Sequence, residues 1–203
     1  SIVLPEHPDG ASDVHIKRFE MPAQQEVRLY QRRLPASLAY ARANGLNRIV
    51  NEAPNARIGI VSAGKSWADT RQALQRLGLP SSPAGIRLLK VGMVWPLDPE
   101  IVVAFARGLD TILVVEEKRP LIEDQLKSIL FDAGPGLGHP RVVGKFDGSS
   151  AWAPSAGAPV LSMVGELNPA VIAERMAALP GVAALLPSGT PAALVSRNEL
   201  RPM

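Results

Sequence analysis

The side chains best suited to chemistry are four consecutive charged residues, Glu116, Glu117, Lys118 and Arg119, which directly follow an apolar stretch. Carboxylates beside cations can act as general acids and bases, and they can equally form salt bridges between domains. Glu117 could also lie at the N-terminus of the next helix, whose dipole attracts negative charge. Because no nucleophile, histidine or set of metal ligands lies within sequence reach, we favour a structural role. We predict no metal ligand in this chain.

A second candidate is the stretch Gly59–Ser66, which satisfies the phosphate-loop pattern G-x-x-x-x-G-K-[ST]. In a true phosphate loop the first glycine follows the strand, and the next residues form an open cradle of backbone N–H groups. Here Gly59 lies inside the predicted strand and is followed by core-type Ile and Val. We therefore expect Gly64, Lys65 and Ser66 to form a strand-to-helix turn in which Ser66 caps the helix. A nucleotide-binding module stays an alternative, and such a turn also favours an anion.

A third candidate is the loop after the next predicted strand, which carries Lys90, Gly92, Met93 and Trp95. Pro96 favours an extended conformation in the residue before it. The loop could contact a neighbouring domain, or Met93 and Trp95 could be hydrophobic plugs over the edge of the sheet. Both interpretations bury the two side chains, and they differ only in which domain covers them.

These candidates are positioned by an alternation of strands and helices. The predicted strands are Arg57–Ser62, Ile86–Val91, Thr111–Val115 and Arg141–Lys145. Thr111–Val115 is apolar after its first residue, which suits a strand covered by helices on both faces of a parallel sheet. Asp98 and Asn168, each followed by proline, are expected to cap helices. We predict an α/β fold with three layers, in which helices cover both faces of a mostly parallel sheet of four or five strands. Open sheets of this kind bind ligands and partners at the carboxyl ends of their strands, where residues 116–119 lie.

The chain divides into four predicted segments. Residues 1–22 form an irregular arm, because three prolines and a glycine occur there without a period. Residues 23–54 form a helical extension, which Pro35 is expected to break or kink into two helices. Residues 55–180 form the α/β domain, and residues 181–203 form a linker or tail.

Composition excludes several classes of function. The net charge of +3 is too small to indicate nucleic-acid binding. No apolar run reaches the roughly 18–20 residues that span a bilayer, and no signal peptide is visible, so we expect a cytoplasmic protein without membrane contact. The three histidines are scattered without metal-ligand spacing. The absence of cysteine excludes disulfides and any iron–sulfur cluster held by thiolates of this chain.

Several segments together resemble one enzyme family. They are LAYARANGLNRIVNEAPNARIGIVSAGKSWADTRQAL (Leu38–Leu74), KVGMVWPL (Lys90–Leu97), FARGLDTILVVEEKRPLIEDQL (Phe105–Leu126), RVVGKFD (Arg141–Asp147) and GELNPAVIAERMAAL (Gly165–Leu179). They resemble the indolepyruvate ferredoxin oxidoreductases, and most of all the long, fused bacterial form. VEEKRP followed by GKFD and GELNP is the most specific combination.

The resemblance implies a domain of a much longer enzyme. Members of that family use thiamine diphosphate, magnesium and iron–sulfur clusters to decarboxylate an aryl 2-oxoacid oxidatively, with coenzyme A as acyl acceptor and ferredoxin as electron acceptor. This chain would be the middle domain, similar to the transketolase C-terminal domain, in a dimeric parent. It would hold no catalytic residue of its own and bind none of the cofactors. It would be inactive alone, serving as a structural interface with the other domains of the polypeptide. The ten residues Gly64, Lys65, Ser66, Lys90, Gly92, Met93, Glu116, Glu117, Lys118 and Arg119 are then candidates for interface or cofactor-proximal positions. A non-enzymatic adaptor domain stays a further alternative.

Overall fold

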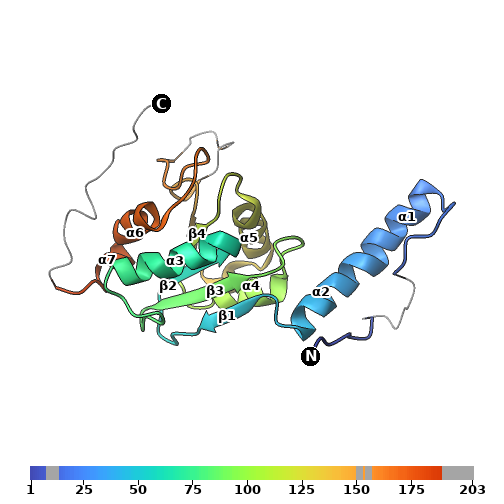
Figure 1. Ribbon diagram of the computed structural model, residues 1–203, viewed down its shortest axis with the longest axis horizontal. Helices are drawn as coiled ribbons and strands as arrows, with labels where there is room; N and C mark the ends of the chain where they lie inside the picture. The colour runs from blue at the N-terminus through green and yellow to red at the C-terminus, as the bar shows by residue number, and fades with distance from the viewer. Residues whose placement is uncertain (8–13, 150–152, 154–156, 189–203) are drawn as a thin grey trace. The chain divides into compact units, whose positions relative to one another are not determined.

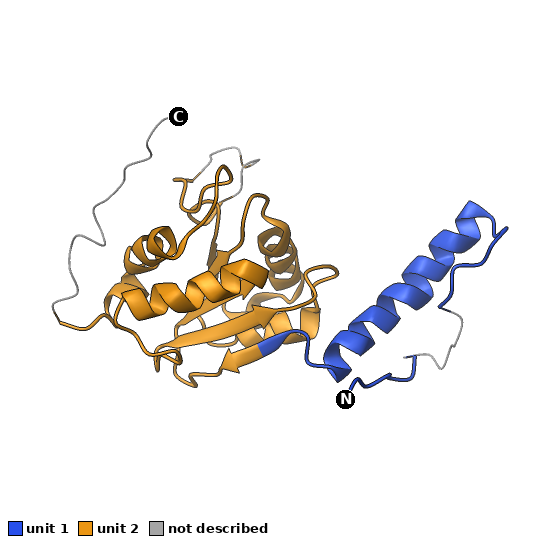
Figure 2. Cartoon of the chain, viewed as in Figure 1, with its two compact units in different colours: residues 1–48 blue, residues 49–203 orange. Residues whose placement is uncertain are grey.

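Two compact units make up the chain, residues 1–48 and residues 49–203 (Figure 2). The structure is a computed structural model that describes residues 1–7, 14–149, 153 and 157–188. No helix in these described ranges is long and apolar enough to cross a membrane.

The first unit is dominated by a single helical run. It consists of α1 (Pro22–Arg28), a π-helical turn η1 (Leu29–Arg33) and α2 (Leu34–Ala43). We expected Pro35 to separate two helices, but the run is continuous. Because proline lacks an N–H and crowds the preceding turn, an ordinary helix is disfavoured there. The wider turn absorbs this change, and the Leu34 N–H donates to the Leu29 carbonyl, five residues back.

The second unit is built on a five-stranded sheet in the order β1-β3-β2-β4-β5. The strands are β1 (Arg48–Asn51), β2 (Ile58–Ala63), β3 (Ile86–Val91), β4 (Thr111–Val115) and β5 (Arg141–Val143). β2 pairs in parallel with β3 and β4, and β4 pairs in parallel with β5. In Figure 1 the arrow of β1, at the edge of the sheet, points opposite to that of β3. The prediction of a mostly parallel sheet of four or five strands is confirmed.

Helices cover both faces of this sheet (Figure 1). One face carries α3 (Gly64–Arg76), α6 (Pro169–Ala177) and the short α7 (Pro180–Ala183), and the other carries α4 (Pro99–Ala106) and α5 (Leu121–Asp132). A 3₁₀ turn, η2 (Pro135–Leu137), precedes β5. The predicted caps form, because the Asp98 carboxylate accepts from the Glu100 N–H and the Asn168 side chain accepts from the Ala170 and Val171 N–H groups.

The core has two parts because alternate strand residues point to opposite faces. The part under α3, α6 and α7 includes Ile60, Leu88, Leu113, Leu74 and Met176. The part under α4 and α5 includes Val61, Leu89, Val114, Phe105 and Leu126. All three central strands therefore bury both of their faces, as expected for parallel strands between helical layers.

Two expected segment boundaries differ from the structure. β1 lies inside residues 23–54, which we expected to be helical, because four residues of alternating exposure form an edge strand without a long apolar run. α7 lies at the start of residues 181–203, which we expected to be a tail, and its Val182 is fully buried in the core. Residues 189–203 of that predicted tail lie outside the described residues.

Candidate functional site

A crevice of about 530 Å³ lies at the carboxyl ends of β2, β3 and β4. The chain leaves β2 into α3 on one face of the sheet and leaves β4 into α5 on the other. Where neighbouring connections part in this way, an open α/β sheet forms a crevice. Seven of the ten predicted site residues line it: Gly64, Lys65, Ser66, Lys90, Gly92, Glu116 and Glu117. Met93, Lys118 and Arg119 are not part of its lining.

The wall that follows β2 is the first turn of α3. The helix begins at Gly64, whose φ is +51°, a backbone region that glycine adopts readily. The N-cap residue is Ala63, so no side chain caps this helix end. We expected Ser66 to be the cap, but it is the third helical residue and is 5% exposed. Its hydroxyl makes no hydrogen bond within the described part of the chain.

The phosphate-loop match does not form a phosphate cradle. Gly59 and the next three residues pair with β3 on one side and β4 on the other, so their backbone groups serve the sheet. A Cβ on Gly59 would lie 2.5 Å from the Leu109 Cδ1 atom and 2.6 Å from the Phe105 Cζ atom. Gly59 is therefore a packing glycine, and residues 59–62 do not form the open backbone cradle of a P-loop.

Lys65 is engaged by three carboxylates. Its Nζ atom lies 2.7 Å from Asp69 Oδ2, 3.1 Å from Glu166 Oε1 and 3.3 Å from Glu117 Oε1. It also donates to the Leu167 carbonyl at 2.9 Å. Hydrogen bonds to Asp69, Glu166 and Glu117 hold the pKa of Lys65 above its ordinary value, against a smaller opposing effect of desolvation. Lys65 thus ties the start of α3 to the loop after β4 and to the loop before α6.

Glu116, rather than Glu117, lies at the N-terminus of the next helix. Its two carboxylate oxygens accept from the Ile122 and Glu123 N–H groups of α5 at 2.8 and 3.0 Å. Burial raises the pKa of Glu116, and these two hydrogen bonds together with the charge of Lys145 act in the opposite direction. A carboxylate at this position stabilises a helix N-terminus, so Glu116 is a structural cap.

The loop positions outside the crevice differ among themselves. Lys118 has a φ of +57° and donates from its ammonium to the Gly165 carbonyl. Arg119 is exposed. Met93 is half-buried, whereas Trp95 is 55% exposed. Trp95 is therefore not a hydrophobic plug over this edge of the sheet.

Two buried charged residues beside the site were missed by sequence reasoning. Lys145 is 2% exposed, and its ammonium donates to the main-chain carbonyls of Glu116 and Ser162. Glu123 is 1% exposed and accepts from the Lys145 N–H at 2.9 Å and from the Lys127 ammonium at 2.6 Å. Burial lowers the pKa of Lys145, and the charges of Glu116 and Glu123 oppose that effect.

Gly144 is the one residue whose type gives a sequence signal for the cluster of Lys145 and Glu123. A Cβ there would lie 2.1 Å from Glu123 Oε2, so the carboxylate occupies the space of a side chain. The residues are 21 positions apart in sequence, and nothing local relates them. Across the described ranges, no group of three or more His, Cys, Asp or Glu side chains could hold a metal ion.

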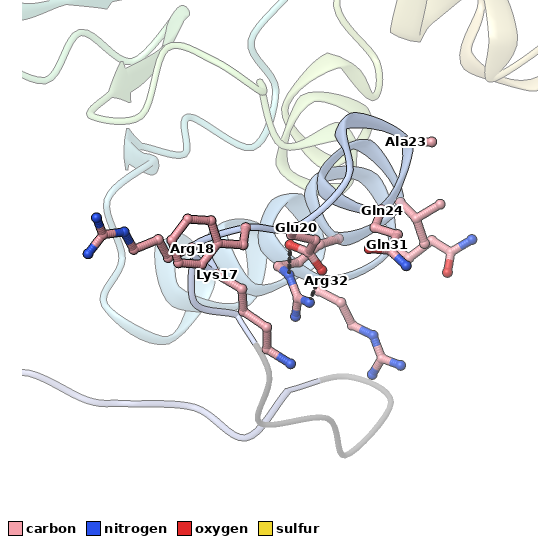
Figure 3. Close-up of a pocket in the computed structure, with 10 residues that line it drawn as sticks. Lys17, Arg18, Glu20, Ala23, Gln24, Gln31 and Arg32 are labelled. Atoms are coloured by element: carbon pink, nitrogen blue, oxygen red, sulfur yellow. Dashed lines mark hydrogen bonds and ion pairs between the residues drawn. The ribbon is translucent and has the colours of Figure 1, made fainter.

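A second hollow, of about 680 Å³, lies within the first unit (Figure 3). Its lining is rich in cations, but Arg28 is paired with the Glu20 carboxylate and the Arg18 guanidinium lies 5.0 Å from the ring centroid of Phe19. The lining contains no histidine, hydroxyl or thiol. Its chemistry is therefore limited to charge and hydrogen bonding.

Comparison with known sequences connects the α/β unit to one family. Residues 48–183 match the family described as indolepyruvate oxidoreductase domain. The hollow in the first unit lies outside this range, whereas the whole crevice lies inside it.

Curated relatives are similar over parts of the chain. An indolepyruvate oxidoreductase subunit IorA of Methanothermobacter thermautotrophicus is 30% identical over 137 residues, which are 66% of this chain and 21% of that protein. The IorA subunit of Methanothermobacter marburgensis is 34% identical over 104 residues, 51% of this chain and 16% of that protein. That of Pyrococcus abyssi is 35% identical over 80 residues, 39% of this chain and 12% of that protein. The matched residues thus span about a fifth or less of each of these relatives.

Solved structures show weaker likeness. A structure titled "Split gene transketolase, inactive beta4 tetramer" has a TM-score of 0.44 at 18% identity, covering 70% of this chain and 41% of that one. The 2-oxoglutarate:ferredoxin oxidoreductase from Magnetococcus marinus has a TM-score of 0.41 at 20% identity, covering 61% of this chain and 20% of that one.

Proposed function

This chain belongs to the family of indolepyruvate oxidoreductase domains, and we propose that it is an interface domain of a longer 2-oxoacid:ferredoxin oxidoreductase. The parent enzyme would oxidatively decarboxylate an aryl 2-oxoacid such as indolepyruvate, form an acyl-coenzyme A and pass electrons to ferredoxin. The match of residues 48–183, which contains the whole crevice, is the observation that carries this proposal.

The parent's cofactors would be held outside this chain. Iron–sulfur clusters need thiolates, and the 203 residues contain no cysteine. Magnesium with thiamine diphosphate needs oxygen ligands, and no fitting cluster of acidic side chains occurs in the described ranges. We therefore assign no step of the reaction to a residue of this chain. Its role would be to hold the catalytic domains of a dimeric parent in register.

The state of the charged residues supports an architectural role. Glu116 caps α5, and Glu117 and Lys65 are ion-paired. Side chains bound in this way maintain a shape and are poorly placed to exchange protons. They keep the loops after β2 and β4 in fixed positions at one edge of the sheet.

Exposed apolar side chains at the same edge support contact with another domain. Trp95 follows β3 and is 55% exposed, and Leu121 begins α5 and is 47% exposed. Val164 is 82% exposed and is next to Gly165, whose carbonyl accepts from Lys118. Gln125 accepts from the Leu97 N–H and donates to the Val94 carbonyl, so the loop of Trp95 is tied to α5. Large exposed apolar groups that gather at one edge are typical of an interaction surface.

The test is site-specific photo-crosslinking in the full-length protein. A photoreactive phenylalanine analogue at Trp95 should crosslink to a segment of the polypeptide outside this chain. The matched control is Phe131 at the far end of α5, which is 80% exposed and should give no such product. Equal yields at both positions would refute the assignment of this edge as the interface.

Activity tests the parent's reaction separately. The full-length protein should reduce ferredoxin in the presence of indolepyruvate and coenzyme A, and the 203-residue chain alone should not. Absence of activity in the cofactor-loaded full-length protein would favour the adaptor alternative.

A further inference from the structure

The crevice contains polar groups that the fold does not use. Lys90 lies at the end of β3 and lines the crevice, and its ammonium makes no hydrogen bond or ion pair within the described part of the chain. Ser66 lines the crevice from α3, is 95% buried and has a hydroxyl without a partner in the same part of the chain. Buried polar groups are normally satisfied, so an unpartnered hydroxyl at a cavity wall is suited to bind a polar ligand.

A third unused polar group lies next to Lys90. Ser62 is opposite Lys90 in the β2–β3 register, so the two side chains are on the same face of the sheet. Ser62 is fully buried, and its hydroxyl has no hydrogen-bond partner among the described residues.

The first turn of α3 adds donors of the same kind. Its N-cap is Ala63, so the first N–H groups of this 13-residue helix have no side-chain acceptor. Gly64 has open space where a Cβ would be, so a ligand can approach the backbone there. Helix N-termini bind anions through such N–H groups and through the helix dipole.

The carboxylates of the crevice already have partners within the chain. Glu116 is bound to the N-terminus of α5, and Glu117 is paired with Lys65. Lys65 is itself shared among Asp69, Glu117 and Glu166, so it is not available to a ligand. The cation left for an incoming anion is Lys90.

We propose that this crevice binds a phosphate group through the Lys90 ammonium, the Ser66 hydroxyl and the first N–H groups of α3. A lysine, a hydroxyl and a helix N-terminus together are typical of phosphate binding. The volume of about 530 Å³ exceeds a bare phosphate and lies within the range of small-molecule sites. Part of the remaining wall is apolar, with Val91, Val94 and Ile122, so the ligand is an organic phosphate with an apolar part. This inference concerns a ligand of the chain itself and does not depend on the proposed parent reaction.

The test is a titration of the ¹⁵N-labelled 203-residue chain at constant ionic strength. The probes are pyrophosphate, inorganic phosphate, phenyl phosphate and acetate. The phosphates should shift the amide signals of Lys65 and Ser66 saturably. Tighter binding of phenyl phosphate would indicate that the natural ligand is a phosphate monoester, and tighter binding of pyrophosphate would indicate a diphosphate. Lys90→Gln should weaken binding at least about tenfold, because a hydrogen bond to a charged group contributes about that factor. Ser66→Ala should weaken it by about threefold to tenfold.

Control variants distinguish binding at a specific site from a general effect of positive charge. Arg76→Gln removes one positive charge from the same helix, about 15 Å from Ser66, and should leave the affinity unchanged. Lys90→Arg keeps the charge and should retain binding. Ser66→Ala removes a hydroxyl that bonds nothing, so the fold stays intact, which the amide spectrum verifies.

Three results would overturn the proposal. The first is the absence of any saturable shift with all three phosphates. The second is an equal loss of affinity in Arg76→Gln and Lys90→Gln. The third is acetate binding as tightly as phosphate, which would indicate that a carboxylate of a neighbouring domain occupies the crevice. None of these results bears on the crosslinking or activity tests of the proposed function.

Discussion

Replacing Gly59 with alanine distinguishes a packing glycine from a ligand-binding one. The added Cβ would lie 2.5 Å from Leu109 Cδ1 and 2.6 and 2.9 Å from two ring carbons of Phe105. Carbon atoms pack best at about 3.5–4.0 Å, so each contact is short by about 1 Å. Phe105 is fully buried and Leu109 is 3% exposed, so neither side chain can turn into solvent.

The magnitude follows from two opposing effects. Overpacking a buried site costs about 1–3 kcal/mol in the free energy of unfolding. Replacing glycine inside a strand recovers about 0.5–1 kcal/mol, because the unfolded chain loses conformational freedom. We therefore expect Gly59→Ala to lower the free energy of unfolding by about 1–2 kcal/mol.

Urea unfolding monitored by circular dichroism measures this change. The control is Gly136→Ala, where no heavy atom lies within 4 Å of the added Cβ, and its effect should stay within about 0.5 kcal/mol. Adding Phe105→Leu to Gly59→Ala should relieve the clash and give a coupling energy of at least about 1 kcal/mol. Equal stability of Gly59→Ala and Gly136→Ala would refute the packing argument.

Substitutions at three further positions test the surroundings of the crevice. Gly144→Ala should destabilise the chain by about 2–4 kcal/mol in the same urea experiment, because the new Cβ displaces the Glu123 carboxylate from the Lys145 N–H. An unchanged free energy of unfolding would show that the carboxylate moves freely. Asn168→Ala should cost about 1 kcal/mol through loss of the α6 cap, whereas Asn168→Asp should be nearly neutral by the same measurement. Burial lowers the pKa of Lys145, so below its ordinary value of 10.5 the unfolded chain binds more protons than the folded chain, and stability from this residue rises with pH in that window. Lys65 does not change the pH dependence of stability in this window. Its pKa is raised in the folded chain, so it is protonated in both the folded and the unfolded chain below 10.5. Urea midpoints at several alkaline pH values should therefore rise less steeply in Lys145→Met, and an unchanged slope would contradict the argument.

Local patterns predicted most of the fold. The strand Thr111–Val115 and the caps Asp98 and Asn168 were placed correctly because each depends on adjacent residues. The edge strand β1 was missed because edge strands lack a continuous apolar run. α7 was missed because a helix of four residues has too little periodicity to detect.

The location of the crevice was also predictable. Parallel strands bring their carboxyl ends to one edge of a sheet, so residues 64–66, 90–92 and 116–117 had to lie near one another. Which of the two adjacent glutamates caps α5 was not predictable, because the turn at residues 117–120 decides which carboxylate points back toward the helix. Lys118, with its φ of +57°, lies in this connection.

The amino-acid sequence alone thus determined the layered α/β architecture, the family and the edge of the sheet at which the crevice lies. Each of these follows from periodicity, caps or short motifs, which act over a few residues. Only the tertiary structure decided how each charge at that edge is used. Lys65 is ion-paired with three carboxylates, and the buried Lys145 donates to main-chain carbonyls. Lys90 lines the crevice. The three lysines look alike in sequence, because the partners that distinguish them lie up to 102 residues away along the chain.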